Sequence, residues 1–432
     1  MSIGEEQPLL ASTPSQDHTL VRESNTDSLI GETCLELNKI WKIAGPSIFS
    51  RLALFSMTVI TQSFAGHLGN TDLAAISIAC TFIISITFGF LLGMASALET
   101  LCGQAYGAKQ YHLLGIYLQL RRATSGGGGA NRFGGDLVDP ISLELPISVL
   151  AAEILAMPAE NCRHSMGFGG CSGNPCTVLG LLGYTVFGGC KESWNGFSAE
   201  AFVGLWEFFK LSAASGVMLS LENMYYRFLV IMSGYMHNTE VAIDGLSICV
   251  TILAWESMIP LGFLASTGVR VANELGAGNV KGAKFATVVS VANTILVGFA
   301  FWLIIVCFSE ELALIFTSTS SVIRMVNKLA TLLAFTVLLN CVQPVLSGVA
   351  VGSGWQALVA YISIGSYYLV GIPMGILLGW LLPSGITGVW TGMMSGTVVQ
   401  TLILAIITVK CDWEKEAHNA QSRIRQRAVN NS

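Results

Sequence analysis

Long apolar blocks separated by short polar stretches dominate the chain from residue 44 onwards. Eight blocks are long enough to cross a hydrocarbon layer of about 30 Å as a helix that rises about 1.5 Å per residue. Their approximate ranges are 44–66, 73–98, 211–235, 241–269, 285–308, 327–353, 357–382 and 385–409. The runs are continuous and do not alternate, which favours helices over the strands of a β-barrel. The pattern therefore predicts an all-α, polytopic membrane helical bundle.

The composition agrees with this prediction and excludes a soluble globular protein. Of the 432 residues, 52% are hydrophobic and only 11% are charged, with a mean hydropathy of +0.62. An average soluble domain carries about 25% charged residues. This apolar composition makes the lipid bilayer the expected partner. The net charge of −5 is small and spread out, so no nucleic-acid partner is expected. Several of the 11 cysteines lie inside apolar runs, where they are typical of small packing residues.

Lysine and arginine residues gather on one side of the predicted membrane. They precede the first span, follow the second and fourth spans and follow the last one, whereas the loops 66–72 and 235–240 contain none. The positive-inside rule then places both termini in the cytosol. Arg324 and Lys328 are exceptions, because they fall on the predicted far side.

The two ends of the chain are predicted to be cytosolic tails. Residues 1–36 are polar and rich in Ser, Thr and acidic residues, which is typical of disorder. Within them Glu5, Leu9 and Leu10 resemble an acidic dileucine sorting signal, and a tail that happens to contain two leucines is an equal alternative. Residues 411–432 form the C-terminal tail.

Residues 123–180 do not follow the pattern of the rest of the chain. They open with four glycines and mix prolines with scattered acidic residues, so we interpret them as an irregular insert. Its Cys162, His164, Cys171 and Cys176 match no familiar zinc-finger spacing, and no metal site is predicted.

An internal repeat divides the chain into two unequal lobes. Residues 66–74 recur as 234–242, and residues 103–108 parallel 272–277, so the segment 44–108 repeats as 211–277. Both copies enter the membrane from the same side, which is typical of secondary transporters. The second copy is followed by four more spans and the first copy only by the insert. We therefore predict an incomplete N-terminal lobe over residues 37–122 and a six-span C-terminal lobe over residues 181–410.

Three motifs resemble those of plant multidrug and toxic compound extrusion (MATE) transporters, also called DETOXIFICATION proteins. They are residues 99–109, Pro260 with 269–279, and 343–356, and the resemblance covers about 31–119 and 181–416. It implies a fold of twelve helices in two six-helix lobes that form a V. Helices three to five and most of six are absent here, while the insert resembles nothing in the family.

The resemblance also points to Glu222 as a proton-coupling residue. A carboxylate at mid-membrane depth costs several kcal/mol when it is charged, so it usually protonates, pairs or faces a cavity. Glu222 lies close to mid-depth and matches the family position whose acid couples cation movement, although a structural pair with a neighbouring helix is the alternative. Tyr225 shares its helix face and is a candidate substrate contact. Arg227 stands where many relatives have a second acid.

Other polar residues inside the spans are secondary candidates. Glu256 is either a second proton-coupling residue or a structural hydrogen-bonding group. Asn340 stands where several relatives have an acid, and it shares a face with Gln343. Since neither titrates, we assign both to substrate contact or to helix–helix hydrogen bonding. Packing or interface belts are favoured over a cavity lining for most of the aromatic residues Trp255, Tyr361, Tyr367, Tyr368 and Trp390.

These observations predict a proton-coupled antiporter that exports organic compounds or xenobiotics from the cytosol. We expect the proton as the coupling ion, no other cofactor or obligate protein partner, and small organic molecules as the solutes. The dileucine-like tail suggests the vacuolar membrane, with the plasma membrane as the alternative. A truncated, non-transporting product of a MATE transporter gene is the other hypothesis. An enzyme is disfavoured, because no nucleophile–base pair or metal-ligand set lies in the membrane blocks.

Overall fold

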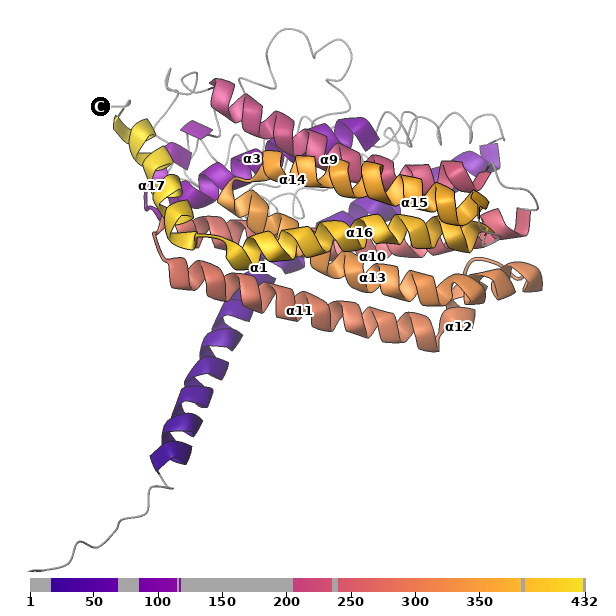
Figure 1. The fold of residues 1–432 in the computed structure, drawn as a ribbon, viewed down its shortest axis with the longest axis horizontal. Coiled ribbons are helices and arrows are strands. Elements are labelled where there is room, and N and C mark those ends of the chain that lie inside the picture. The colour runs from indigo at the N-terminus through magenta and orange to yellow at the C-terminus, as the bar shows by residue number, and fades with distance from the viewer. Residues whose placement is uncertain are drawn as a thin grey trace, which may run out of the picture.

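A computed structural model of the 432-residue chain describes residues 17–68, 85–114, 116–117, 205–234, 240–381 and 385–429. Every regular element in these ranges is a helix, and most of the long helices run side by side (Figure 1). The elements are α1 (Asp17–Leu68), α3 (Ser85–Gly107), α9 (Leu205–Gly234), α10 (Glu240–Gly276), α11 (Val280–Cys307), α12 (Ser309–Leu314), α13 (Ser320–Ser353), α14 (Gln356–Ser363), η6 (Ile364–Gly371), α15 (Ile372–Ile376), η7 (Leu377–Leu381), α16 (Gly385–Lys410) and α17 (Trp413–Val429). The two η segments are π-helical.

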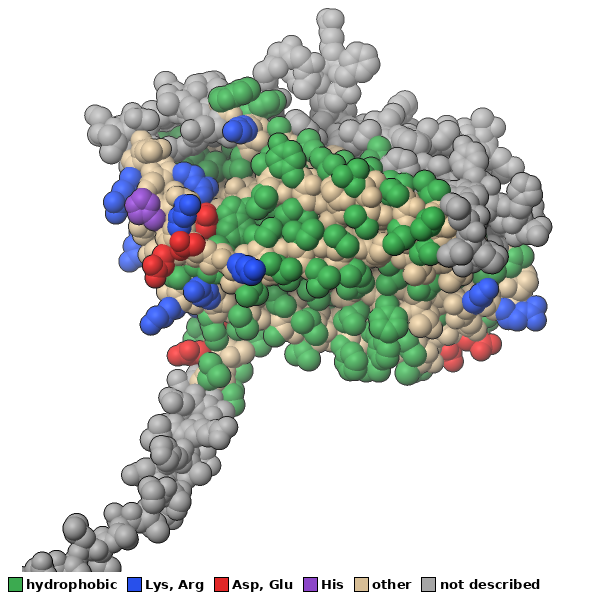
Figure 2. Space-filling view, in the orientation of Figure 1, with side chains coloured by type: hydrophobic (Ala, Val, Ile, Leu, Met, Phe, Trp, Pro, Cys, Tyr) green, Lys and Arg blue, Asp and Glu red, His purple; other side chains and the backbone are tan. Residues whose placement is uncertain are grey.

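Five helical segments in the described ranges are long and apolar enough to cross a membrane. They are Asp244–Gly276, Val280–Cys307, Ser320–Ser353, Gln356–Gly379 and Gly385–Lys410. Figure 2 shows hydrophobic side chains over the middle of the visible face and charged ones towards its two ends. This distribution suits a bilayer that surrounds the middle of the bundle. The predicted all-α membrane bundle is thus confirmed, while the insert 123–180 and the sorting-signal residues lie outside the described residues.

The structure corrects the prediction for the N-terminal tail. Helix α1 begins at Asp17, inside the segment 1–36 for which no regular structure was predicted. The reason is local, because residues 17–45 contain no proline and many good helix formers. Tertiary contact adds to this, since the buried Glu36 accepts a hydrogen bond of 2.6 Å from Nε of Arg270 on α10.

The predicted C-terminal tail also contains a helix. Trp413, Ala417, Ala420 and Ile424 recur at helical spacing and form the buried face of α17. This helix lies across one end of the bundle, and α12 lies at the opposite end (Figure 1). The charge pattern predicted only a cytosolic tail here. The helical spacing of these four apolar residues explains why the segment forms a helix that packs on the bundle.

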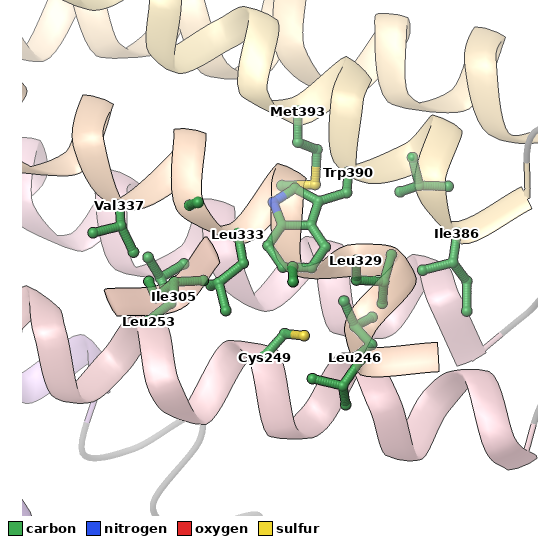
Figure 3. Packing of buried hydrophobic residues seen from close by; sticks show 14 of the residues in the cluster. Leu246, Cys249, Leu253, Ile305, Leu329, Leu333, Val337, Ile386, Trp390 and Met393 are labelled. Carbon is green, nitrogen blue, oxygen red and sulfur yellow. The ribbon is translucent and has the colours of Figure 1, made fainter. Parts of the chain in front are cut away.

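The main hydrophobic core lies between α10, α13 and α16. Trp390 of α16 is buried against Leu329 and Leu333 of α13, with Cys249 of α10 beneath it (Figure 3). Its indole nitrogen donates a 3.1 Å hydrogen bond to Thr336 Oγ1, which satisfies its buried polar atom. Lipid chains are as apolar as these residues, so close packing rather than exclusion of water holds such helices together.

Glycines bring the backbones of α10 and α13 into direct contact. A Cβ on Gly348 or on Gly352 of α13 would lie 2.5 Å from the carbonyl oxygens of Leu264 and Gly268 on α10, respectively. Since no Cβ tolerates that distance, only glycine fits these positions. The two helices therefore pack as small-residue membrane interfaces do.

The internal repeat is visible in the backbone hydrogen bonds. At the end of α3, Ala108 N–H donates to Gln104 O and Lys109 N–H to Tyr106 O, each at 3.0 Å. At the end of α10, Ala277 N–H donates to Asn273 O and Gly278 N–H to Leu275 O, also at 3.0 Å. Lys109 and Gly278 both take the left-handed conformation, with φ of 60° and 73°. The two copies thus end in the same helix-capping turn.

The two copies contact each other through these ends. Gly107 of α3 lies against the carbonyl oxygen of Asn273, and Gly276 of α10 lies against the carbonyl oxygen of Gln104. Because Gln104 and Asn273 are equivalent in the repeat, the contact is reciprocal, as a pseudo-twofold axis requires. We call the contact between residues 100–107 of α3, residues 268–276 of α10 and the end of α13 the seam.

Candidate functional site

The carboxylate of Glu222 lies where α9 meets α13 and α16. Its Oε1 accepts a 2.7 Å hydrogen bond from Nε2 of Gln343 and a 3.2 Å bond from Nε2 of Gln400. Within the described residues its Oε2 receives no hydrogen bond and the carboxylate forms no ion pair. Two uncharged amides from different helices therefore hold one oxygen of this acid.

Hydrogen bonds also fix the two amides. Gln343 Nε2 donates to Ser347 Oγ at 3.1 Å on its own helix. Gln400 Nε2 donates to Ser363 Oγ at 3.0 Å, and Ser363 in turn donates to the carbonyl oxygen of Val359. The carboxylate is thus linked to α13, to α16 and, through Ser363, to α14.

An aromatic group lies one turn beyond Glu222 on the same helix. Tyr225 stacks on Tyr367 with ring centroids 4.2 Å apart and donates its hydroxyl to the carbonyl oxygen of Met393. A Cβ on Gly371 or Gly396 would collide with this hydroxyl, so the two glycines make room for the ring. Tyr367 belongs to the π-helical segment η6, and such segments often occur at functional sites.

The second acid, Glu256, lies on α10 and contacts α13. The thiol of Cys341 donates to its Oε1 at 3.1 Å, and the side chain of Asn340 is also a hydrogen-bond partner. Oε2 of Glu256 is buried and has no hydrogen-bond partner among the described residues. It is therefore an acceptor that a proton could occupy without breaking a bond.

Helix α13 supplies partners to both acids. Asn340 and Gln343 are three residues apart and share a face, so Asn340 reaches Glu256 while Gln343 reaches Glu222. Pro344 lies inside α13 directly after them, and Pro260 lies inside α10 four residues after Glu256. A proline cannot donate to the carbonyl four residues earlier, so each helix is weakened beside an acid.

The structure brings together most of the predicted site residues. Glu222 and Gln343 are hydrogen-bonded, with Tyr225 one turn further along α9, whereas Glu256 and Asn340 form a second pair. Arg227 lies in α9 and its side chain lies outside the described part of the chain. Trp255 and Tyr361 are exposed, Trp390 is a core residue, and only Tyr367 and Tyr368 lie beside Tyr225.

Sequence reasoning missed Gln400 and Ser363. Gln400 is a long amide in the middle of the apolar block 385–409, and that position alone could have identified it. Ser363 carries no comparable signal, because serine is common in membrane helices. In the described residues no group of three or more His, Cys, Asp or Glu side chains is placed to hold a metal ion.

Comparisons with known proteins identify the family. A model of the MatE family matches residues 46–124 and 214–377, which together make up more than half of the chain. Protein DETOXIFICATION 27 of Arabidopsis thaliana is 48% identical over 455 aligned positions, which cover 93% of this chain and 94% of that protein. Protein DETOXIFICATION 26 of the same plant is 45% identical, with 93% of each chain covered.

Solved structures show the same fold. The crystal structure of the eukaryotic MATE transporter AtDTX14 superposes with a TM-score of 0.76 at 29% identity, over 91% of this chain and 99% of that one. The bent form of the Vibrio cholerae MATE transporter VcmN gives a TM-score of 0.66 at 14% identity, over 90% of this chain and 98% of that one. The protein is therefore an integral membrane protein that belongs to the MatE family of transporters.

Proposed function

We propose that this chain is a proton-coupled antiporter that exports organic compounds from the cytosol, with Glu222 as the residue that carries the proton. The observation that carries the proposal is the Glu222 carboxylate, held inside the bundle by two amides and without an ion pair among the described residues. The DETOXIFICATION names of the relatives support export of organic compounds.

The geometry suggests how protonation acts on the bundle. A proton that binds Oε2 of Glu222 leaves both amide donors on Oε1. It removes the negative charge, however, and hydrogen bonds to a neutral acceptor are about half as strong as bonds to an ionised one. The hydrogen bonds that link α9 to α13 and α16 therefore weaken on protonation. A cationic solute at the same place also loses its counter-ion, so proton binding and solute release are coupled.

The remaining predicted site residues take roles consistent with their positions. Tyr225, Asn340 and Gln343 are proposed to contact the solute, and Glu256 is proposed as a second proton-coupling residue. The support is their location around the two acids on α9, α10 and α13.

The test is proton-gradient-driven solute flux in sealed vesicles, with Glu222→Gln compared with the parent chain. The variant keeps an amide-sized side chain and cannot titrate, so flux is expected to fall by at least about tenfold and to lose its pH dependence. Glu311→Gln serves as the matched control, because Glu311 is exposed on α12 at the far end of the bundle. Equal flux for Glu222→Gln and the parent at all pH values would refute the mechanism.

We further propose that the α17 end of the bundle faces the cytosol, so that both termini are cytosolic, in the vacuolar membrane or alternatively the plasma membrane. Exposed Lys281, Lys284, Lys410 and Arg425 support this, because they lie at the start of α11, at the end of α16 and on α17. Arg324 and Lys328 lie in the first turns of α13, which contacts α12, the helix that carries the acidic Glu310 and Glu311. Protease accessibility of a C-terminal tag in sealed vesicles tests the orientation.

A second candidate function is a non-transporting product that lacks part of the first lobe. The alignment with DETOXIFICATION 27 extends over 455 positions, more than the 432 residues of this chain, so the relative has residues without a counterpart here. The family match also breaks between residues 124 and 214. The same flux assay on the parent chain distinguishes the two candidate functions, because a non-transporting product requires flux no higher than that of empty vesicles.

A further inference from the structure

The closed seam leaves several buried polar atoms unsatisfied. Thr100 Oγ1 donates to the carbonyl of Val351 at 2.7 Å, Gln104 Nε2 donates to the carbonyl of Gly352 at 3.1 Å, and Gln356 of α14 donates to Thr100 Oγ1 at 2.9 Å. In contrast, Oε1 of Gln104 and Oδ1 of Asn273 in the seam, and Oε1 of the adjoining Gln356, are buried and lack a partner among the described residues. Each such acceptor costs free energy that water would recover if the seam opened. The seam is therefore poorly suited to stay closed by itself.

Helix α17 lies across the seam and contacts both copies of the repeat. Trp413, Ala417 and Ala420 pack with Val271 and Leu275 at the end of α10, within a cluster that includes α11 and α13. About one turn later, Ile424 belongs to a cluster with Leu98 and Leu101 of α3 and Phe208 of α9. One apolar face of α17 thus bridges the two halves of the chain.

Two polar side chains of α17 fit over glycines at the bundle end. Arg423 donates a 3.2 Å hydrogen bond from Nη2 to the carbonyl oxygen of Ser353, the last residue of α13. A Cβ on the adjacent Gly354 would lie 2.6 Å from Nη1 of Arg423. Gln421 lies over Gly278, the left-handed residue that ends the α10 turn. A cation at a helix C-terminus is favourable. Arg423 therefore fixes α17 to α13, the helix that carries the amide partners of both acids.

We propose that α17 is a latch that holds the seam closed, and that α17 must detach before the two copies can separate at this end. Its apolar face and Arg423 supply the stabilisation that the unsatisfied seam lacks. The proposal stands on packing alone and does not require Glu222 to carry a proton. It adds to the proposed transport cycle a step at the bundle end, more than one helix turn away from either acid.

The test is hydrogen–deuterium exchange of the full-length protein in lipid nanodiscs, which expose both faces and need no assumption about orientation. The variants are Arg423→Gln and Ile424→Ser, and Arg425→Gln is the matched control, because Arg425 is exposed on the same helix. Seam peptides 97–108 and 268–277 are expected to exchange at least about fivefold faster in the two latch variants. This corresponds to the loss of one charge-assisted hydrogen bond or one packed side chain. The control should match the parent.

Two outcomes would overturn the proposal. Seam exchange equal to that of the parent in both latch variants would show that α17 does not hold the seam. Exchange that rises equally in core peptide 329–337 would show a general loss of packing instead of local release. Flux of the Glu222→Gln variant is independent of these readings, so failure of the latch and failure of proton coupling remain distinguishable.

Discussion

At the scale of single residues, Glu36 shows how an acid outside the apolar blocks can be tied to the bundle. Burial raises the pKa of its carboxyl, but hydrogen bonds from Arg270 and Lys39 and their charges outweigh burial and hold the pKa below the ordinary value. Arg270 also pairs with Glu274 at 2.6 Å, so the carboxyl lies beside two cations and one further acid. Glu36 therefore stabilises the folded protein mainly in its ionised form.

The lowered pKa of Glu36 predicts a pH dependence of stability with a definite sign. Its contribution is complete above the pKa of the unfolded chain and is lost as the pH falls through the lower folded-state pKa. Glu36→Gln should therefore lower the free energy of unfolding by about 1–2 kcal/mol at pH 7, and the difference from the parent should shrink below about pH 4. Thermal unfolding in detergent across this pH range measures it.

Glu32→Gln is the control for that experiment, because Glu32 is exposed one turn earlier on α1. It should unfold like the parent at every pH. A difference for Glu36→Gln that stays constant down to pH 3 would contradict the assigned role, since it would not depend on ionisation.

The two acids inside the bundle could be found from the sequence, but most of their partners could not. Glu222 and Glu256 stand out because charged residues are rare in apolar blocks. The convergence of Gln343 and Gln400 on one oxygen of Glu222 depends on how α13 and α16 pack, which no local pattern specifies. The stacking of Tyr225 on Tyr367 likewise depends on a π-helical segment that the apolar run does not reveal.

At the scale of helices, the reciprocal contact between α3 and α10 predicts a sensitive position. Gly107→Ala places a Cβ against the carbonyl oxygen of Asn273, which is backbone and cannot rotate away. The helix ends must therefore separate, and we expect a loss of about 1–3 kcal/mol in stability of the closed form. Thermal unfolding, with exchange of peptide 268–277 as a local measure, checks this.

Gly45→Ala is the matched control on α1, because a Cβ there meets nothing within 4 Å. Alanine is the better helix former, so this variant should be neutral or up to about 1 kcal/mol more stable. Equal stability of Gly107→Ala and the parent would show that the two ends do not touch in the membrane.

The helical elements themselves follow from sequence much better than their ends. Apolar length identified α10, α11, α13 and α16, with helix ends that differ from the predicted ones by up to seven residues. The same criterion overlooked α17, because its apolar face is only one residue wide in each turn. It also overlooked the first turns of α1, whose helix is fixed by propensity and by the Glu36–Arg270 contact.

At the scale of the whole molecule, the break in the family match predicts the result of a repair. Replacing residues 125–204, which precede α9, by the corresponding stretch of DETOXIFICATION 27 should restore the part of the first lobe on which α3 and α9 pack. Because the two acids and their partners lie on α9, α10, α13 and α16, the chimera should show gradient-driven flux that Glu222→Gln abolishes. Flux in sealed vesicles measures both.

The parent chain is the comparison for this chimera. Flux of the parent as high as that of the chimera would eliminate the non-transporting candidate. A chimera that folds and shows no flux would instead contradict the assignment of Glu222, because the complete bundle would then be present.

The attachment of both amides to a single oxygen of Glu222 has a consequence for the Glu222→Gln variant. A glutamine there can offer its own carbonyl oxygen to Gln343 and Gln400, so the surrounding scaffold survives while the charge is gone. If Glu222 carries the proton as proposed, such a protein imitates the protonated form permanently. Its structure would show which conformation that form prefers, without any need to control the pH.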